Sequence, residues 1–179
     1  MFAQSLWLRQ RYNWPFLVVL ALAVVLIFFR LDRADLQTDG AVYSVRSLGY
    51  LDYLNTDRQT TPLQWFDQPP GWTKLSFHDA PPLPFIIQFI FFSLFGRSTL
   101  AARLPGAILS VATVGLVMAI ANRLWGKAAG LTAGLLLASS TLFTWAAREP
   151  YIEGVETFFI VLCLWCFLQA LQRQSWWVG

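Results

Sequence analysis

The sequence predicts an all-α integral membrane protein, and three observations support this class. Apolar residues make up 56% of the 179 residues and charged residues only 13%, whereas a soluble domain has about 25% charged residues. The mean hydropathy is +0.51. Every Asp lies within 32–79 and every Glu within 149–156, so long apolar stretches carry no acid. These observations exclude a disordered chain and an ordinary soluble enzyme.

The basic residues do not predict a nucleic-acid partner. The net charge is only +3, and the Lys and Arg residues form no continuous run. A nucleic-acid site needs basic residues gathered on one surface. We therefore attribute the positive balance to membrane topology and expect no nucleic-acid binding.

Four apolar runs are long enough to be spanning helices, since a bilayer core of about 30 Å needs about 20 helical residues. Pro15 opens the first run at a first-turn position, and Arg30 closes it with a side chain that can reach the headgroups. No small-residue cleavage site follows, so we expect this run to stay as an anchor. The predicted spans are 14–31, 104–122, 128–147 and 156–172.

A fifth apolar run, 83–96, is about 14 residues long and suits an interfacial or re-entrant helix within an outer loop 32–103. If it does not cross, both acid windows face outward and the basic link 123–127 faces the cytoplasm, as the positive-inside rule favours. If it does cross, the link lies outside and the 148–153 turn lies inside. Long outer loops are exempt from the charge rule, so the first topology is favoured.

Two patterns in the later spans predict packing. Gly126, Gly130 and Gly134 recur every four residues and so form one helix face that permits close approach of a neighbour. Cys163 and Cys166 have the C-x-x-C spacing but lie among apolar residues, where a thiolate would be poorly solvated. We expect no redox or metal role for them.

The first candidate functional residue is Asp39, directly before a run with helical spacing of apolar residues, 41–53. Its carboxylate could simply be an N-cap that accepts amide hydrogen bonds from the first helical turn. It could also be a catalytic group. The two roles are compatible, because a capped carboxylate is rigidly placed.

The second candidate is the pair His78 and Asp79, which precedes the short apolar run. Three prolines nearby fix an extended loop there. An imidazole and a carboxylate supply part of a divalent metal site, but not a whole one. A solvated loop pair is the alternative interpretation.

The third candidate is the turn 148–156, which contains Arg148, Glu149, Glu153 and Glu156. These charges could be no more than helix-end residues at the interface, with an acid that favours a helix N-terminus. Against this interpretation stands the cost of placing carboxylates beside apolar spans without a partner or a task.

Taken in order after an anchor helix, the segments of the chain resemble the N-terminal part of a known family. The segments are Asp39-Gly40-Ala41-Val42-Tyr43, His78-Asp79-Ala80-Pro81-Pro82-Leu83, Ala101-Ala102-Arg103-Leu104-Pro105, and an Arg148 to Glu153 turn followed by Phe158-Phe159. The family is the polyprenyl-phosphate-sugar-dependent glycosyltransferases of the C-type fold (glycosyltransferase family 39), relatives of protein O-mannosyltransferases and aminoarabinose transferases. The resemblance implies an enzyme of the plasma or inner membrane. It implies transfer of a sugar from a polyprenyl-phosphate donor to a lipid, protein or glycan acceptor at the outer face.

The resemblance also implies roles for single residues. Asp39 holds the position of the catalytic carboxylate, and Glu153 that of a second acid of the site. His78 and Asp79 stand where residues line the site and help to hold a divalent metal. The sequence departs from the family pattern at three points: Gly40 replaces a second acid, Asp79-Ala80 interrupts a His-Pro-Pro form, and Glu153 replaces an Asp.

Displacement of a polyprenyl phosphate with inversion needs a base for the acceptor hydroxyl and a cation near the leaving phosphate. Asp39 would be the base. Arg103 or Arg148 could pair with phosphate oxygens. Tyr43 could stack on the sugar, although aromatic residues of an outer loop more often anchor to headgroups.

Members of the family have more spanning helices, so the sequence resembles a fragment, for which we expect no independent turnover. The alternative function is a non-catalytic multi-span subunit of a transporter or an assembly. Transporters place ionisable groups inside spans, whereas the interiors of 104–122, 128–147 and 156–172 hold none. This observation favours the enzyme.

Overall fold

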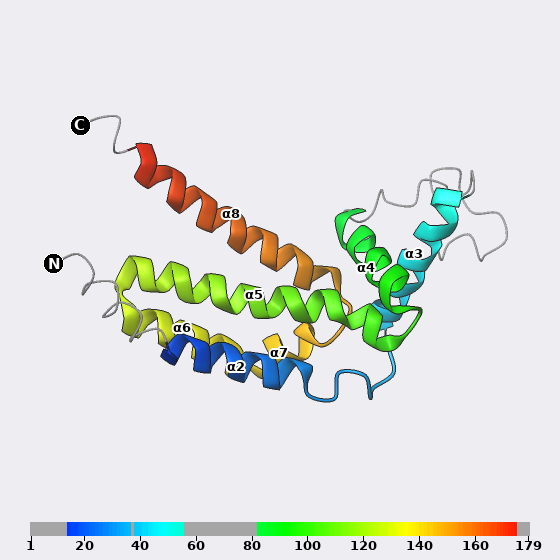
Figure 1. Ribbon diagram of the computed structural model, residues 1–179, viewed down its shortest axis with the longest axis horizontal. Helices are drawn as coiled ribbons and strands as arrows, with labels where there is room; N and C mark the ends of the chain where they lie inside the picture. Colours follow the sequence, from blue (N-terminus) through cyan, green and yellow to red (C-terminus); the bar gives the residue numbers. More distant parts are fainter. Residues whose placement is uncertain (1–13, 37, 56–81, 175–179) are drawn as a thin grey trace. The chain divides into compact units, whose positions relative to one another are not determined.

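The computed structural model describes residues 14–36, 38–55 and 82–174, and within these ranges every regular element is an α-helix (Figure 1). This confirms the predicted all-α class. The helices are α2 (Trp14–Phe28), α3 (Thr38–Asn55), α4 (Pro82–Phe95), α5 (Thr99–Trp125), α6 (Lys127–Ser139), α7 (Thr141–Ala147) and α8 (Ile152–Gln174).

Among the described residues, α5 and α8 are each long and apolar enough to cross a membrane. The pair α6 and α7 passes the same test as one span, with a bend of 67° between its members. Helices α2 and α4 are apolar but shorter than a typical span. The part of the chain that the structure describes is therefore an all-α membrane protein with two such helices, or three if the bent pair counts as one span.

Local chemistry explains where the helices begin and end. Arg30 has φ 55°, a left-handed conformation that stops α2 at Phe28, before the predicted end at 31. Ser98 accepts a hydrogen bond from the amide of Ala101 at 3.1 Å and so caps α5. This cap starts α5 five residues before the predicted start at 104.

The break between α6 and α7 lies at Ser140, whose ψ of 118° is extended. Its hydroxyl accepts a hydrogen bond from the amide of Phe143 at 3.3 Å, and its carbonyl accepts one from the amide of Thr144 at 2.9 Å. A serine that caps the following turn competes with continuation of the preceding helix. The predicted span 128–147 is therefore two helices.

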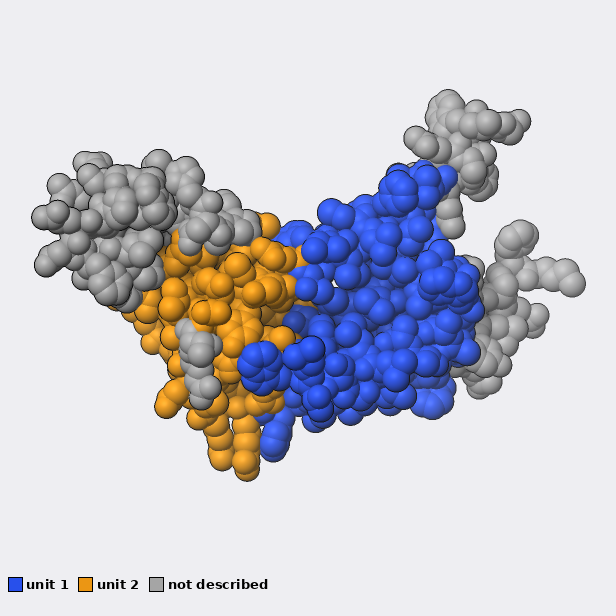
Figure 2. Space-filling model, turned by 180° about the vertical axis from the view of Figure 1, so that it is seen from behind, with its two compact units in different colours: residues 1–29, 110–145, 157–179 blue, residues 30–109, 146–156 orange. Residues whose placement is uncertain are grey.

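The chain divides into two compact units, drawn in different colours in Figure 2. Unit 1 comprises residues 1–29, 110–145 and 157–179. Its buried core is Val19, Ala23, Val114, Met118 and Ala138.

Glycines allow the helices of unit 1 to pack closely. Gly130 and Gly134 are buried on α6. A Cβ on Gly130 would lie 2.8 Å from the carbonyl oxygen of Met118, and one on Gly134 would collide with the Met118 side chain. The small-residue face predicted from the four-residue spacing is confirmed at these two positions.

Unit 2 comprises residues 30–109 and 146–156. It contains α3, α4, the beginning of α5 and the turn that leads into α8. Helices α3 and α4 pack against each other, and Phe92, Ala101 and Ala102 form a buried cluster with Leu36 and Leu48. Helix α4 coincides with the predicted short helix 83–96 to within one residue at each end.

Candidate functional site

Two of the predicted acids lie in unit 2 at the beginnings of helices. Asp39 is in the first turn of α3 and Glu153 in the first turn of α8, and both are exposed. Because a helix N-terminus carries partial positive charge, a carboxylate is favoured at each position. Helix α3 begins at Thr38, so Asp39 lies inside its first turn instead of preceding the helix as an N-cap.

The two acid-bearing segments are in direct contact. Gly40, the neighbour of Asp39, is buried against the ring of Pro150, which lies three residues before Glu153. A Cβ on Gly40 would be 2.9 Å from Pro150 Cδ. Nearby, Arg148 Nη2 donates a hydrogen bond to the carbonyl of Arg30 at 3.3 Å. The segment before α3 and the turn before α8 therefore form one corner of unit 2.

Arg103, in the second turn of α5, contacts both segments of this corner and is only 2% exposed. Its Nη1 donates to the carbonyls of Leu31 at 2.9 Å and Ala34 at 2.7 Å. Its Nη2 donates to the carbonyl of Asp35 at 3.1 Å and to the carboxylate of Glu149 at 3.0 and 3.3 Å. Both terminal nitrogens thus bind protein groups, whereas the sequence left open whether Arg103 or Arg148 pairs with the donor phosphate.

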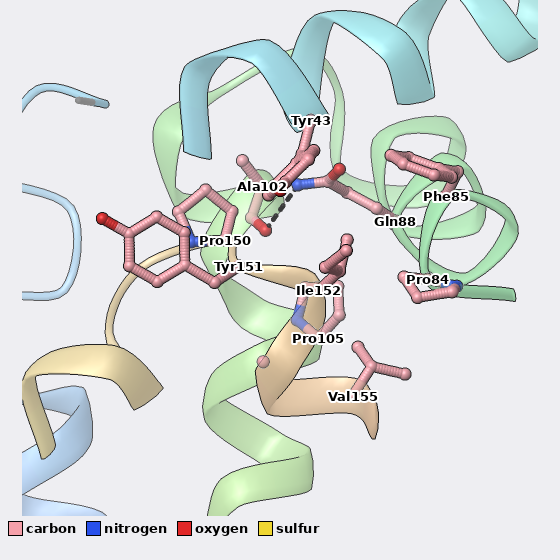
Figure 3. A pocket seen from close by; sticks show the side chains of 11 residues that line it. Tyr43, Pro84, Phe85, Gln88, Ala102, Pro105, Pro150, Tyr151, Ile152 and Val155 are labelled. Atoms are coloured by element: carbon pink, nitrogen blue, oxygen red, sulfur yellow. Dashed lines mark hydrogen bonds between the residues drawn. The ribbon is translucent and has the colours of Figure 1, made fainter. Parts of the chain in front are cut away.

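A small pocket lies in the same unit (Figure 3). Its lining is mostly apolar and includes Tyr43, whose ring meets that of Phe85 edge to face with centroids 6.0 Å apart. The guanidinium of Arg46 lies over the other ring of this pair, Phe85, at 4.9 Å. The lining residues are Tyr43, Pro84, Phe85, Gln88, Ala102, Pro105, Gly106, Pro150, Tyr151, Ile152 and Val155.

A buried polar network supports one wall of the pocket. Gln88 Nε2 donates to Ser44 Oγ at 3.1 Å and to the Ala102 carbonyl at 2.9 Å, the bond drawn in Figure 3. Ser47 donates to Gln88 Oε1. A buried amide is costly unless its donors and acceptor are paired, and here they are. Gln88 therefore ties α4 to both α3 and α5.

Asp39, Tyr43, Arg103, Arg148 and Glu153 were singled out from the sequence, and all of them lie in unit 2. The structural roles of Gln88 and Glu149 were not predicted. A signal existed for the first, because Gln88 is the one amide in the apolar run 83–96. For Glu149 no sequence signal identified its partner, since 46 residues separate it from Arg103.

The predicted metal ligands His78 and Asp79 lie outside the described residues. Within the described part of the chain, no group of three or more His, Cys, Asp or Glu residues is placed to hold a metal ion. Cys163 and Cys166, also in that part, are unpaired thiols on the exposed surface of α8.

Comparison with known proteins identifies the family. The chain is 27% identical over 95 residues to "Putative mannosyltransferase YkcB" of Bacillus subtilis (strain 168), a match that covers 53% of this chain and 13% of that protein. No solved structure matches the chain. The family model described as dolichyl-phosphate-mannose-protein mannosyltransferase matches residues 79–179, more than half of the chain. The chain therefore belongs to this family of membrane glycosyltransferases, as the sequence resemblance predicted.

Proposed function

We propose that this chain forms part of an enzyme that transfers a sugar from a polyprenyl-phosphate donor to an acceptor at the outer face of the plasma or inner membrane. The observation that carries the proposal is the contact between Gly40 and Pro150 within unit 2. It joins the start of α3, which bears Asp39, to the turn before Glu153. The second of these segments lies within the family match at 79–179.

The proposed reaction proceeds with inversion at the anomeric carbon. The acceptor hydroxyl oxygen forms a bond to that carbon, and the bond from the carbon to the phosphate oxygen breaks. The electron pair leaves with the polyprenyl phosphate, and the hydroxyl proton passes to the carboxylate of Asp39 as general base. Glu153 supplies a second carboxylate to the same site, and both acids are exposed in unit 2, where substrate can reach them.

Two further residues are proposed to contact the donor. Arg148 lies in the turn before Glu153 and is half-buried, so its positive charge can stabilise the phosphate as negative charge develops there. Tyr43 lines the pocket together with Phe85. An aromatic side chain such as tyrosine can stack on a sugar ring.

A divalent metal remains a separate proposal, which rests on His78 and Asp79 alone. The described residues add no cluster of metal ligands, so no step of the reaction is assigned to a metal. If those two residues help to hold one, transfer by the membrane-embedded full-length protein falls after treatment with a chelator and returns with Mg²⁺ or Mn²⁺. Unchanged transfer after chelation contradicts this part of the proposal.

The test of the main proposal is the substitution Asp39→Asn in the full-length protein, assayed in membranes with a polyprenyl-phosphate sugar donor. Asparagine keeps the shape of the side chain but cannot accept the hydroxyl proton, so we expect transfer to fall by about 10²- to 10⁴-fold. Asp32→Asn is the matched control, because Asp32 is exposed in the turn after α2. Full activity of Asp39→Asn would exclude Asp39 as the base.

The assay also addresses residues 1–179 alone. The match covers only 13% of the mannosyltransferase-named relative, and we propose that this piece does not turn over by itself. Sugar transfer by purified 1–179 would contradict this statement. The role of Asp39 would then still be tested by the substitution Asp39→Asn.

A further inference from the structure

Arg103 is placed to align the two acid-bearing segments of unit 2. Its guanidinium contacts the linker before α3 through the carbonyls of Leu31, Ala34 and Asp35. The same group contacts the turn before α8 through the carboxylate of Glu149. Asp35 precedes Asp39 by four residues, and Glu149 precedes Glu153 by four. A single buried side chain therefore contacts both segments, and on each segment a contact lies four residues before the acid.

We propose that Arg103 is a positioning residue of the transfer reaction, which sets Asp39 and Glu153 relative to each other by clamping the two segments that carry them. This inference rests on the proposed function. It differs from a direct contact with the donor phosphate, because both terminal nitrogens of Arg103 already bind carbonyls or Glu149, and the side chain is 2% exposed.

The shape of the guanidinium explains why arginine suits this place. Its two terminal nitrogens carry four N–H donors in a fixed plane, and this plane can address several acceptors on two segments at once. A lysine ammonium is a compact charge with three donors at one point. Lysine could keep the ion pair with Glu149 but could not also reach three carbonyls on the opposite segment.

The contact with Glu149 also neutralises the buried positive charge of Arg103. Glu149 Oε1 is 3.0 Å from Arg103 Nη2, and the two side chains are 14% and 2% exposed. A buried cation without its partner is strongly unfavourable. Loss of the Glu149 carboxylate therefore disturbs the same clamp from the opposite side, and Arg103→Lys and Glu149→Gln should produce the same kinetic defect.

The experiment measures kcat and KM for the lipid donor in the membrane-embedded full-length protein, per folded molecule. We expect Arg103→Lys and Glu149→Gln each to lower kcat by about 10- to 100-fold with KM nearly unchanged, because small misplacements of a catalytic group cost rates of this size. The double variant should fall no further than either single variant, because both remove the same clamp. Arg97→Lys is the matched control, since Arg97 is exposed, and it should keep parental kinetics.

Two results would overturn the proposal. A raised KM in Arg103→Lys with unchanged kcat would make the residue a donor-binding group. Unchanged kcat per folded molecule in both single variants would make the clamp purely structural.

A cross-linking measurement keeps the inference testable without activity. In a Cys163→Ser and Cys166→Ser background, the pair Asp39→Cys and Tyr151→Cys places thiols on the two clamped segments. A short bismaleimide should link this pair efficiently with Arg103 present, and several-fold less in Arg103→Lys. Equal linking in both would overturn the clamp. Activity is read separately, in the protein that keeps Asp39 and Tyr151. If the cysteine pair cross-links as expected but that parental protein transfers no sugar, the proposed function is contradicted and the clamp stays supported.

Discussion

Gly40 and Pro150 meet at a contact that has no room for a side chain. A Cβ on Gly40 would lie 2.9 Å from Pro150 Cδ and 3.0 Å from Cγ. A proline ring is rigid and cannot rotate away as the end of a flexible side chain could. This geometry gives a reason for Gly40 at the position where the family resemblance leads us to expect a second acid, since an acid there would separate the two segments.

Gly40→Ala should therefore loosen unit 2. Overpacking costs about 1–3 kcal/mol, which exceeds the helix-propensity gain of about 1 kcal/mol for replacing glycine by alanine. Unfolding in detergent should show a loss of stability for Gly40→Ala. Gly115→Ala is the control, because its Cβ would meet Leu20 at an ordinary 3.6 Å, and it should be neutral or stabilising.

A second substitution makes this prediction sharper. Pro150→Ala removes the ring atoms that the new Cβ would meet. Adding it to Gly40→Ala should recover part of the lost stability, so that the double variant is less destabilised than the sum of the single variants. Strict additivity of the two effects would show that this contact does not limit packing at Gly40.

At the same scale, the sequence identified several charged residues of unit 2 but not all of their partners. Asp39 and Glu153 were predicted from their places beside apolar runs, and both lie in the first turn of a helix, where an acid is favoured. Arg103 was also singled out, yet its partners lie 46 to 72 residues away along the chain. No local pattern specifies pairs at such separation, so the clamp could be seen only in three dimensions.

At the scale of elements, apolar periodicity and length predicted where helices exist, and capping decided where they end. Helix α4 was predicted almost to the residue, and Gly96, with φ 77°, follows it. The extended loop expected at the three prolines was wrong in part, because Pro82 and Pro84 lie in the first turn of α4, where a helix tolerates proline. The span 128–147 was predicted as one helix, since it holds no charged residue and no proline. Ser140 interrupts it through a hydroxyl that caps α7. The neighbouring Ser139, Ser140 and Thr141 are a weak signal, because Ser and Thr also occur inside helices.

Substitution of Gln88 tests how α3, α4 and α5 are held together in unit 2. Gln88→Leu keeps a similar volume but leaves the Ala102 carbonyl without the side-chain donor that now reaches it at 2.9 Å. Loss of one partner of a buried hydrogen bond costs about 1–3 kcal/mol. Ser93→Ala is the control, because Ser93 is exposed and bonds only within its own helix, to Phe89. Chemical unfolding should therefore show a clear loss of stability for Gln88→Leu and almost none for Ser93→Ala.

At the scale of the whole molecule, composition was sufficient to predict the membrane class. A chain with few charges and long apolar runs is stable when those runs lie as helices in the bilayer. The number of crossings was harder to predict. Helix α8 is long and almost entirely unburied, with only 6% of its spanning window buried. The bent pair α6 and α7, in contrast, could cross the membrane together or return to the same side.

The topology prediction depends on that bent pair. If α6 and α7 cross as one span, the basic link at Arg123 and Lys127 lies in the cytoplasm, as the positive-inside rule favours, and Glu153 lies outside. Single cysteines at 79, 125 and 153, in a full-length protein without Cys163 and Cys166, can be labelled from outside intact cells with a membrane-impermeant maleimide. We expect labelling at 79 and 153 but not at 125. Labelling at 125 and 153 together would make the pair re-entrant, since both of its ends would face outward. Labelling at 125 without 153 would place Glu153 in the cytoplasm and exclude a single outer site shared with Asp79.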